Sequence, residues 1–133
     1  MKTKGFTLVE LLVVIAILAI LATVSVVGYT QYIDGANQRV VEDALTKAKN
    51  DAINYDIAFG NKDGIVDEDE ALAAVKSVFG ADYAEVDGLT VTEVTTTTGT
   101  GENAVTTVTG VSAVTYTKGN ATATWTVADG TIE

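Results

Sequence analysis

The N-terminal part of the chain is one long apolar run. It extends from Phe6 to Val27 and is interrupted by only four residues: Thr7, Glu10, Thr23 and Ser25. About 20 apolar residues are enough for a helix to span a bilayer. The short segment before the run is basic, with Lys2 and Lys4, which favours a cytoplasmic N-terminus. We therefore predict a transmembrane helix over residues 6–28, after which the chain faces outward.

The hydrophobic pattern becomes amphipathic at Tyr29 and stays so to Ile57. Apolar residues recur every three or four positions, as on one face of a helix: Ile33, Ala36, Val40, Ala44, Ala48 and Ala52. Val41, Leu45 and Ile53 widen this stripe. Polar and charged residues, Asp56 among them, fall largely off this stripe. We predict a helix over 29–57 whose apolar stripe packs on its own domain.

A period-two pattern fills the C-terminal part of the chain. Val, Tyr or Trp alternates with Thr in four segments: Leu89 to Thr97, Ala104 to Thr109, Val111 to Thr117 and Ala121 to Val127. This alternation is typical of strands with one buried face. Turn sequences follow at 99–103, 118–120 and 129–130.

These patterns together predict an α+β fold. An antiparallel sheet of three or four strands is expected to pack on the 29–57 helix. The sheet is expected to place four residues in the core: Val91, Val94, Tyr116 and Trp125.

The amino-acid composition limits the classes of function that this chain can have. The chain has 18 acidic and 8 basic residues, a formal net charge of −10, and neither Cys nor His. Direct binding of nucleic acid is not expected, because phosphate neutralisation needs clustered Lys and Arg. Disulfides are excluded, and general-base and zinc chemistry lack their usual residues. Since no nucleophile–base arrangement or cofactor loop is visible either, we do not expect an enzyme.

Glu10 is the one acid within the apolar run. A carboxylate at the centre of a bilayer costs about 2.5–3.5 kcal/mol on insertion scales, so an intramembrane acid is a functional hypothesis whose partner should be named. A chain that began at Phe6 would carry a free α-amine nearby. In staggered neighbouring copies, Glu10 of one could pair with the Phe6 ammonium of the next. The alternative is that Glu10 reaches the lipid headgroups.

The segment from Lys4 to Ile17, with its Gly5–Phe6 junction and an acid at the fifth position after it, resembles the class III leader of type IV pilins and type II secretion pseudopilins. The resemblance implies cleavage between Gly5 and Phe6 by a prepilin peptidase, N-methylation of Phe6 and the pilin fold. It therefore divides the chain into a leader (1–5), a transmembrane or filament-core helix (6–28) and a globular head (29–133). The head would comprise the 29–57 helix, an acidic loop with a short helix (60–80) and the β region (87–133).

The resemblance also implies a function. The chain is expected to be a major pilin that polymerises with copies of itself through its N-terminal helix, into a surface filament for adhesion or twitching motility. Its other partners would be the prepilin peptidase and the pilus assembly machinery. It would span the cytoplasmic membrane once before assembly and lie outside the cell afterwards. Two alternatives stay open: a pseudopilin or minor pilin of a type II secretion or competence system, and a membrane-tethered, Ca²⁺-responsive module.

The acidic loop from Gly60 to Glu70 partly matches a calcium-binding EF-hand. With Gly64 at the loop glycine, four residues fall at ligand positions three, five, nine and twelve: Asn61, Asp63, Asp67 and Glu70. The first ligand position would be Phe59, which has no ligand atom. The alternative is a turn followed by a helix from Glu68 to Phe79 with Asp67 as its N-cap.

Overall fold

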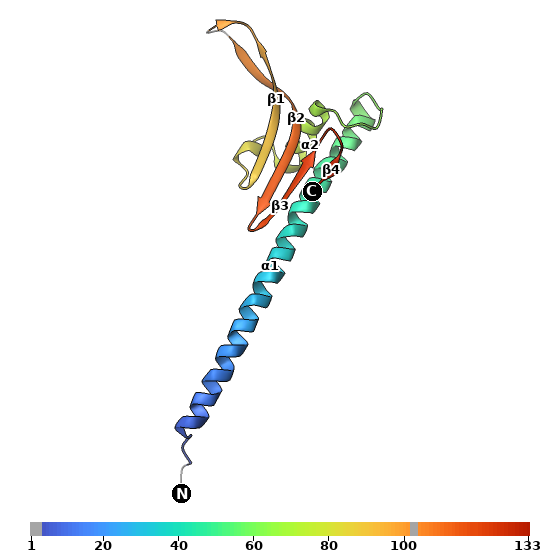
Figure 1. The fold of residues 1–133 in the computed structure, drawn as a ribbon. Coiled ribbons are helices and arrows are strands. Elements are labelled where there is room, and N and C mark those ends of the chain that lie inside the picture. The colour runs from blue at the N-terminus through green and yellow to red at the C-terminus, as the bar shows by residue number, and fades with distance from the viewer. Residues whose placement is uncertain (1–3, 102–103) are drawn as a thin grey trace. The chain divides into compact units, whose positions relative to one another are not determined.

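The computed structural model describes residues 4–101 and 104–133 of an α+β chain. Two helices, a 3₁₀ turn and four strands follow one another (Figure 1): α1 (Leu8–Phe59), α2 (Glu68–Phe79), η1 (Tyr83–Glu85), β1 (Leu89–Thr98), β2 (Val105–Lys118), β3 (Ala121–Thr126) and β4 (Thr131–Ile132). The chain divides into two compact units, residues 1–35 and 36–133. Residues 1–3 of the expected leader, and Glu102 and Asn103 of the expected 99–103 turn, lie outside the described residues.

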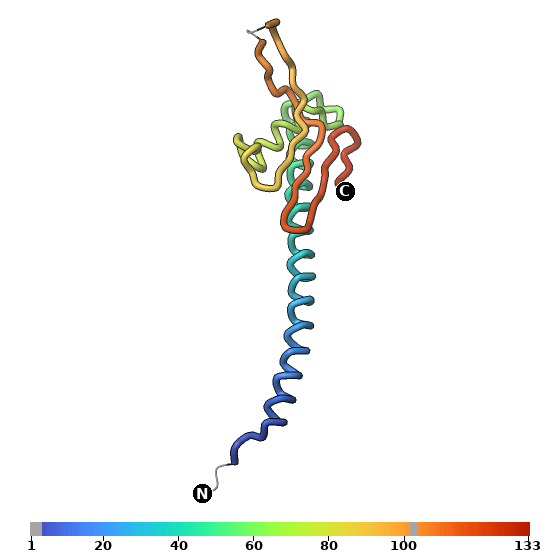
Figure 2. The backbone as a smooth tube through the Cα atoms, turned by 60° about the vertical axis from the view of Figure 1, so that its left-hand side comes forward, coloured from blue at the N-terminus to red at the C-terminus, as the bar shows by residue number. Residues whose placement is uncertain are grey.

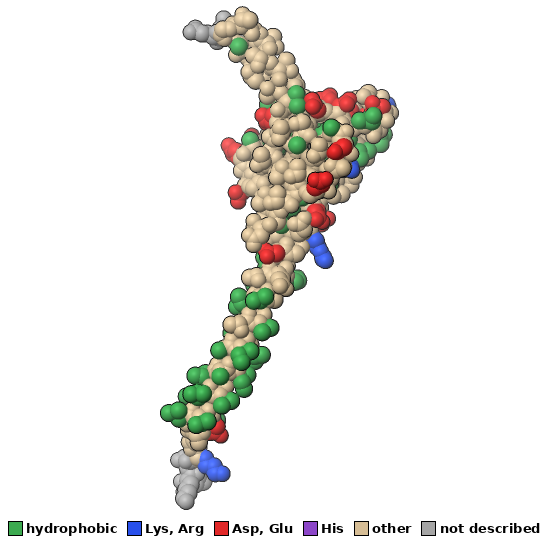
Figure 3. Space-filling view, in the orientation of Figure 1, with side chains coloured by type: hydrophobic (Ala, Val, Ile, Leu, Met, Phe, Trp, Pro, Cys, Tyr) green, Lys and Arg blue, Asp and Glu red, His purple; other side chains and the backbone are tan. Residues whose placement is uncertain are grey.

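The N-terminal unit is helical from Leu8, and its side chains are exposed throughout residues 4–35. Hydrophobic side chains cover its surface (Figure 3). By length and composition, the apolar stretch of α1 can cross a membrane.

Three hydroxyl groups in this unit bond back to the helix backbone. Thr23 Oγ1 donates to the Ile20 carbonyl at 2.7 Å and Ser25 Oγ to the Leu21 carbonyl at 2.8 Å. Thr30 Oγ1 donates in the same way to the Val27 carbonyl at 2.9 Å. No hydroxyl of the three therefore needs a water molecule as its acceptor.

In the C-terminal unit, α1 buries a single line of side chains: Val41, Leu45, Ala48, Ala52 and Asp56. The predicted amphipathic helix is thus confirmed, and four residues of its predicted stripe are buried: Val41, Leu45, Ala48 and Ala52. The predicted stripe is wrong at Ile33, Ala36 and Val40, which are exposed, and at Asp56, which was expected off the stripe but continues the buried line. The line through Val41 and Leu45 carries larger side chains than the line through Val40 and Ala44, so turning it inward removes more apolar area from water.

The sheet is antiparallel throughout, in the order β1-β2-β3-β4. The two strands predicted at 104–109 and 111–117 are one strand, β2, which continues through Gly110. The pairing with β1 shifts register at Thr92/Glu93 and at Val94/Thr95, where β2 contributes the extra residues Ser112 and Thr109. A Cβ at Gly110 would lie 2.6 Å from the Cβ of Glu68, so this glycine allows the strand to approach the start of α2 rather than ending it.

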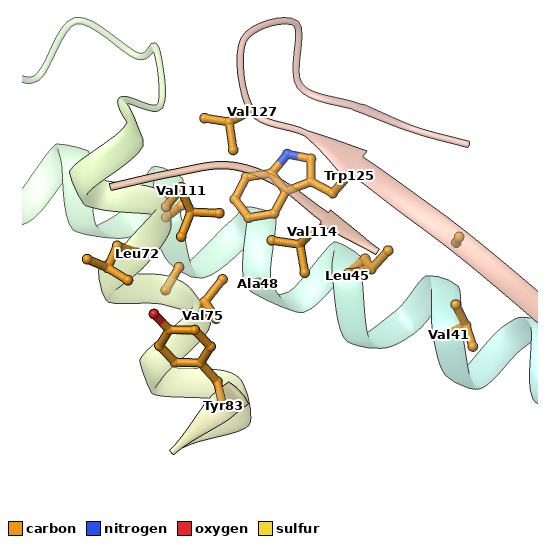
Figure 4. Packing of buried hydrophobic residues seen from close by; sticks show 14 of the residues in the cluster. Val41, Leu45, Ala48, Leu72, Val75, Tyr83, Val111, Val114, Trp125 and Val127 are labelled. Atoms are coloured by element: carbon orange, nitrogen blue, oxygen red, sulfur yellow. The ribbon is translucent and has the colours of Figure 1, made fainter. Parts of the chain in front are cut away.

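One face of the sheet forms the core with both helices. The buried cluster joins Leu45 and Ala48 of α1 and Val75 of α2 to Val114 and Trp125 of the sheet (Figure 4). Of the four predicted core residues, Trp125 is fully buried. Three are only half-buried: Val91, Val94 and Tyr116. The two valines lie on β1, an edge strand that has a neighbour on one side only.

The other face of the sheet carries threonines. Thr115 pairs with Thr124 and Thr117 with Thr122 across β2 and β3, each with 3.0 Å between the two hydroxyl oxygens. The period-two alternation in the sequence therefore corresponds to two faces of the sheet. One face forms the core, and the other, here called the hydroxyl face, carries the threonine side chains.

Candidate functional site

The Gly5–Phe6 peptide bond lies just before α1 begins. Residues 4–7 are not helical. Phe6 is 91% exposed, and no heavy atom lies within 4 Å of the position that a Cβ on Gly5 would take. An exposed, non-helical segment is where a protease can bind the backbone. The predicted cleavage site is therefore accessible in this chain.

Glu10 is held at the N-terminal end of α1 by Thr7. The Thr7 N–H and the Thr7 hydroxyl both donate to Glu10 Oε2, at 2.8 and 2.9 Å, and the Glu10 N–H donates to Thr7 Oγ1 at 3.3 Å. This reciprocal arrangement is a capping box, with a carboxylate at the positive end of the helix dipole.

This capping role of Thr7 and Glu10 was not predicted, although Thr-x-x-Glu before an apolar run is the sequence signature of a capping box. Thr7 holds the Glu10 carboxylate at the end of the helix where cleavage would create the Phe6 ammonium. The cap therefore orients Glu10 as well as starting α1.

Comparison with known proteins agrees with this N-terminal geometry. Residues 1–26 match the family model described as the prokaryotic N-terminal methylation motif. This motif is the class III leader of type IV pilins, and it supports a type IV pilin-like or pseudopilin protein. The match covers the first 26 of 133 residues. The remainder is α+β, with a helix packed on a four-stranded antiparallel sheet, an arrangement consistent with the pilin fold. No curated protein and no solved structure matches the chain.

The acidic loop forms an internally bonded turn. The Asn61 side chain donates to Asp67 Oδ2 at 3.1 Å and accepts the Asp63 N–H at 3.1 Å. Asp63 Oδ1 accepts the Ile65 N–H at 2.8 Å, and Glu70 Oε2 accepts the Asp67 N–H at 3.0 Å. The alternative interpretation, a turn followed by a helix with Asp67 as N-cap, is confirmed.

Side-chain oxygen atoms of the four candidate calcium ligands already accept hydrogen bonds, either from another of these side chains or from the loop backbone. Within residues 4–101 and 104–133, no three acidic side chains are grouped closely enough to hold a metal ion. Calcium binding by this loop stays a prediction. If it is right, calorimetric titration with millimolar CaCl₂ gives heat that Asp67→Asn reduces, and a titration without heat ends the hypothesis.

The residue that organises this loop is Asp56, which was predicted to lie off the buried stripe and was not expected to contact the loop. Asp56 is fully buried at the end of α1. Its Oδ1 accepts the Lys62 N–H at 2.8 Å and its Oδ2 accepts the Gly64 N–H at 3.0 Å. Both donors belong to residues in the left-handed region, with φ of 63° and 79°. Asp56 follows Ala52 by four positions, and this spacing is the signal that could have placed it on the buried line.

Asp56→Ala should destabilise the C-terminal unit by about 2–4 kcal/mol, because each N–H that loses a charged acceptor forfeits about 1.5–3 kcal/mol. Relief of repulsion with nearby Glu70 offsets part of that loss. Denaturant unfolding of the full chain in detergent, followed by the fluorescence of Trp125, measures the effect. Asp56→Asn keeps one acceptor oxygen and should lose about half as much. Equal losses for the two variants would contradict this role of Asp56.

Glu70 is a second buried acid beside Asp56, only 3% exposed. Burial, and then the charges of Asp56, Asp67 and Asp69, raise its pKa above the ordinary 4.5, while the hydrogen bond from the Asp67 backbone lowers it. Gly60 lies against it, and a Cβ there would overlap Glu70 Oε1 and lie 2.8 Å from the Asp56 Cα. The loop is thus closed over two neighbouring carboxyl groups.

A pH dependence follows from Glu70. Because its pKa is higher in the folded chain than in the unfolded chain, the folded chain binds the proton first, and stability rises as the pH falls through the raised pKa. The gain is complete below the ordinary value of 4.5. Relative to Glu70→Gln, the wild type should therefore gain unfolding free energy between pH 7 and pH 4 in denaturant titrations. The control variant Glu68→Gln replaces an exposed acid of the same helical turn but keeps Glu70, so it should show the same gain as the wild type relative to Glu70→Gln.

Proposed function

We propose that this chain is the major subunit of a type IV pilus, which polymerises through α1 into a surface filament for adhesion or motility. The observation that carries the proposal is a wholly exposed apolar helix that begins with a capped acid, immediately after an accessible Gly5–Phe6 junction. Such a helix needs lipid or other helices to cover it, since soluble proteins rarely expose apolar patches of this extent.

The proposed mechanism has two steps. Before assembly, α1 lies in the cytoplasmic membrane, where helical hydrogen bonding satisfies its backbone. A prepilin peptidase cuts after Gly5, and the new α-amine of Phe6 is methylated and stays cationic. In the filament, Glu10 of one copy then pairs with the Phe6 ammonium of its neighbour. Away from water, the attraction between the two charges is strong and specific for one stagger.

Surface charge opposes this association. Cleavage removes Lys2 and Lys4 and leaves 6 basic against 18 acidic side chains, a formal net charge of −12 before the termini. Copies with this charge repel one another. The free energy of assembly therefore comes from burying the apolar part of α1, and the Glu10–Phe6 pair sets the register. The role is structural rather than catalytic.

N-terminal mass spectrometry of sheared surface filaments tests the proposal. We expect this chain to be the most abundant filament protein and to begin with N-methyl-phenylalanine at Phe6. A processed chain that is scarce in the filaments would replace the major-pilin role with that of a minor pilin or pseudopilin. A surface chain that retains Met1 would overturn the proposal.

A further inference from the structure

The β1–β2 hairpin extends beyond the rest of the sheet. Thr95 pairs with Val108 and Thr98 with Val105, whereas β3 pairs with β2 only from Ala113 to Lys118. The segments 95–98 and 105–108, here called the threonine ribbon, are exposed except for half-buried Val108. Two views show the ribbon projecting past the other strands (Figures 1 and 2). Among the described residues, no third strand pairs with the ribbon, which is thus a two-stranded element.

The ribbon begins at two register shifts in the pairing of β1 with β2, and its residues remain paired beyond them. Both register shifts between β1 and β2 lie at its base, opposite residues Thr92 to Thr95. On the partner strand, Gly110 packs closely on Glu68 of α2, and the ribbon continues beyond this contact. β-Bulges bend and twist a hairpin, so the sequence directs these strands away from the core.

The surface of the ribbon differs from that of the sheet's surroundings. In the sequence of residues 95–109 the one charged residue is Glu102, and the described residues 95–101 and 104–109 carry none, although the chain as a whole has a net charge of −10. Acidic side chains are visible around the body of the C-terminal unit, whereas the projecting ribbon is free of them (Figure 3). Cross-strand hydroxyl pairs cover it, such as Thr97 with Thr106 at 3.0 Å.

Both backbone edges of the ribbon are unprotected. Natural edge strands usually carry charges or Pro, which block pairing with another chain. The ribbon has no charge in its described residues, and the whole chain lacks Pro. An isolated two-stranded hairpin is only marginally stable in water. Such an element gains most from a partner that completes its main-chain hydrogen bonds.

We propose that the threonine ribbon docks on a second copy of this chain and ties neighbouring subunits together within the filament. This inference rests on the proposed function. The charge pattern favours a copy as the occupant, because two chains of net charge −12 repel least where one of them presents an uncharged surface. Assembly through α1 would hold the copies at high effective concentration, so that a contact too weak to form between free chains becomes stable.

Site-specific crosslinking tests which molecule the ribbon contacts. The chain has no Cys, so Val105→Cys places a single thiol at a side chain that is 63% exposed. Benzophenone-maleimide is attached to it in filaments that also contain wild-type subunits, so that assembly does not depend on the variant. We expect dimers and higher multimers of this chain alone. Thr122→Cys on the hydroxyl face of the sheet is the control. Crosslinks to a different protein, or none, would overturn the inference.

Negative charges placed on the threonine ribbon test whether its contact with a second copy is needed for filament assembly. Thr97→Glu with Thr106→Glu puts two negative charges on the ribbon and should lower the yield of sheared filaments roughly tenfold, the effect of about 1.4 kcal/mol per contact. Thr117→Glu with Thr122→Glu is a matched control, since this pair has the same 3.0 Å separation. The control should retain its yield. Equal losses in both double variants, or a loss in neither, would overturn the inference.

The two proposals fail in different ways. If wild-type chains form filaments and the ribbon variants behave as the controls do, the docking role is wrong and the pilin function stands. If wild-type chains form no filament at all, the proposed function itself is wrong. Variants that assemble normally but no longer attach cells to surfaces would assign the ribbon to an external ligand, and this too would overturn docking on a second copy.

Discussion

Glu10→Ala should reduce surface filaments by roughly a hundredfold or more. In the assembled state, the variant would leave the Phe6 ammonium without a counter-charge away from water. Removal of one partner of a buried ion pair costs about 3–5 kcal/mol, and each 1.4 kcal/mol is a factor of ten. The head should stay folded, because Glu10 lies outside the C-terminal unit. Quantitative immunoblots of sheared filaments and of membranes measure the two pools of protein.

Two further variants separate charge from capping at this site. Glu10→Gln can keep the hydrogen bonds with Thr7 but carries no charge, and it should lose filaments as Glu10→Ala does. Thr7→Ala breaks the cap, which is worth about 0.5–2 kcal/mol, but leaves the charge, and it should assemble at a moderately reduced level. If Glu10→Gln assembles as the wild type does, the acid serves only as a cap. If the wild-type chain is found only as single copies in the membrane, and Glu10→Ala leaves its amount there unchanged, a membrane-tethered module becomes the better description.

Trp125→Ala should destabilise the C-terminal unit by about 3–5 kcal/mol, the usual cost of replacing a buried aromatic residue with Ala. Trp125 is fully buried and lies beside Val114 and beneath Val127 (Figure 4). For a unit of this size, the loss should lower the melting temperature by roughly 15–30 °C. Thermal unfolding of the full chain in detergent, followed by circular dichroism of the sheet, measures the shift.

Two control variants separate the effects of side-chain volume and of burial at Trp125. Its indole N–H is a buried side-chain donor that has no hydrogen-bond partner within the described chain. Trp125→Phe removes this donor and leaves a smaller cavity, so it should cost clearly less than Trp125→Ala. Val105→Ala, at a side chain that is 63% exposed, should leave the melting temperature almost unchanged. A Phe variant as unstable as the Ala variant would mean that volume alone does not explain the effect.

Much of the fold could be predicted because its periodicities are long and regular. The apolar run and the amphipathic helix are both part of α1, and the predicted helix from Glu68 to Phe79 has those bounds in the structure. The alternation of Val and Thr predicts the strands, and it also predicts that Trp125 of β3 lies on the buried face of the sheet. These are local signals, because a strand or helix face is visible within a single segment.

The features that were missed depend on distant parts of the chain. The sequence around Gly110 predicts a break between two strands. The contact that explains this glycine is with Glu68 of α2, about forty positions earlier in the chain. Asp56 was assigned to the exposed face because a charged residue is seldom buried, and only the turn formed by Lys62 and Gly64 explains its burial. The capping of Glu10 by Thr7, by contrast, was visible locally.

The hydroxyls of Thr23 and Ser25, which donate to the backbone of their own helix, affect how a subunit moves between the membrane and the filament. Each hydroxyl already donates its proton to a carbonyl of the same helix. This stretch therefore presents the same apolar surface to hydrocarbon tails as to the helices of adjacent subunits. Passage between bilayer and fibre therefore demands no exchange of polar partners along it. Under the proposed function, a subunit released from a fibre could return to the lipid without rearranging these groups, so one pool of protein can be drawn upon repeatedly.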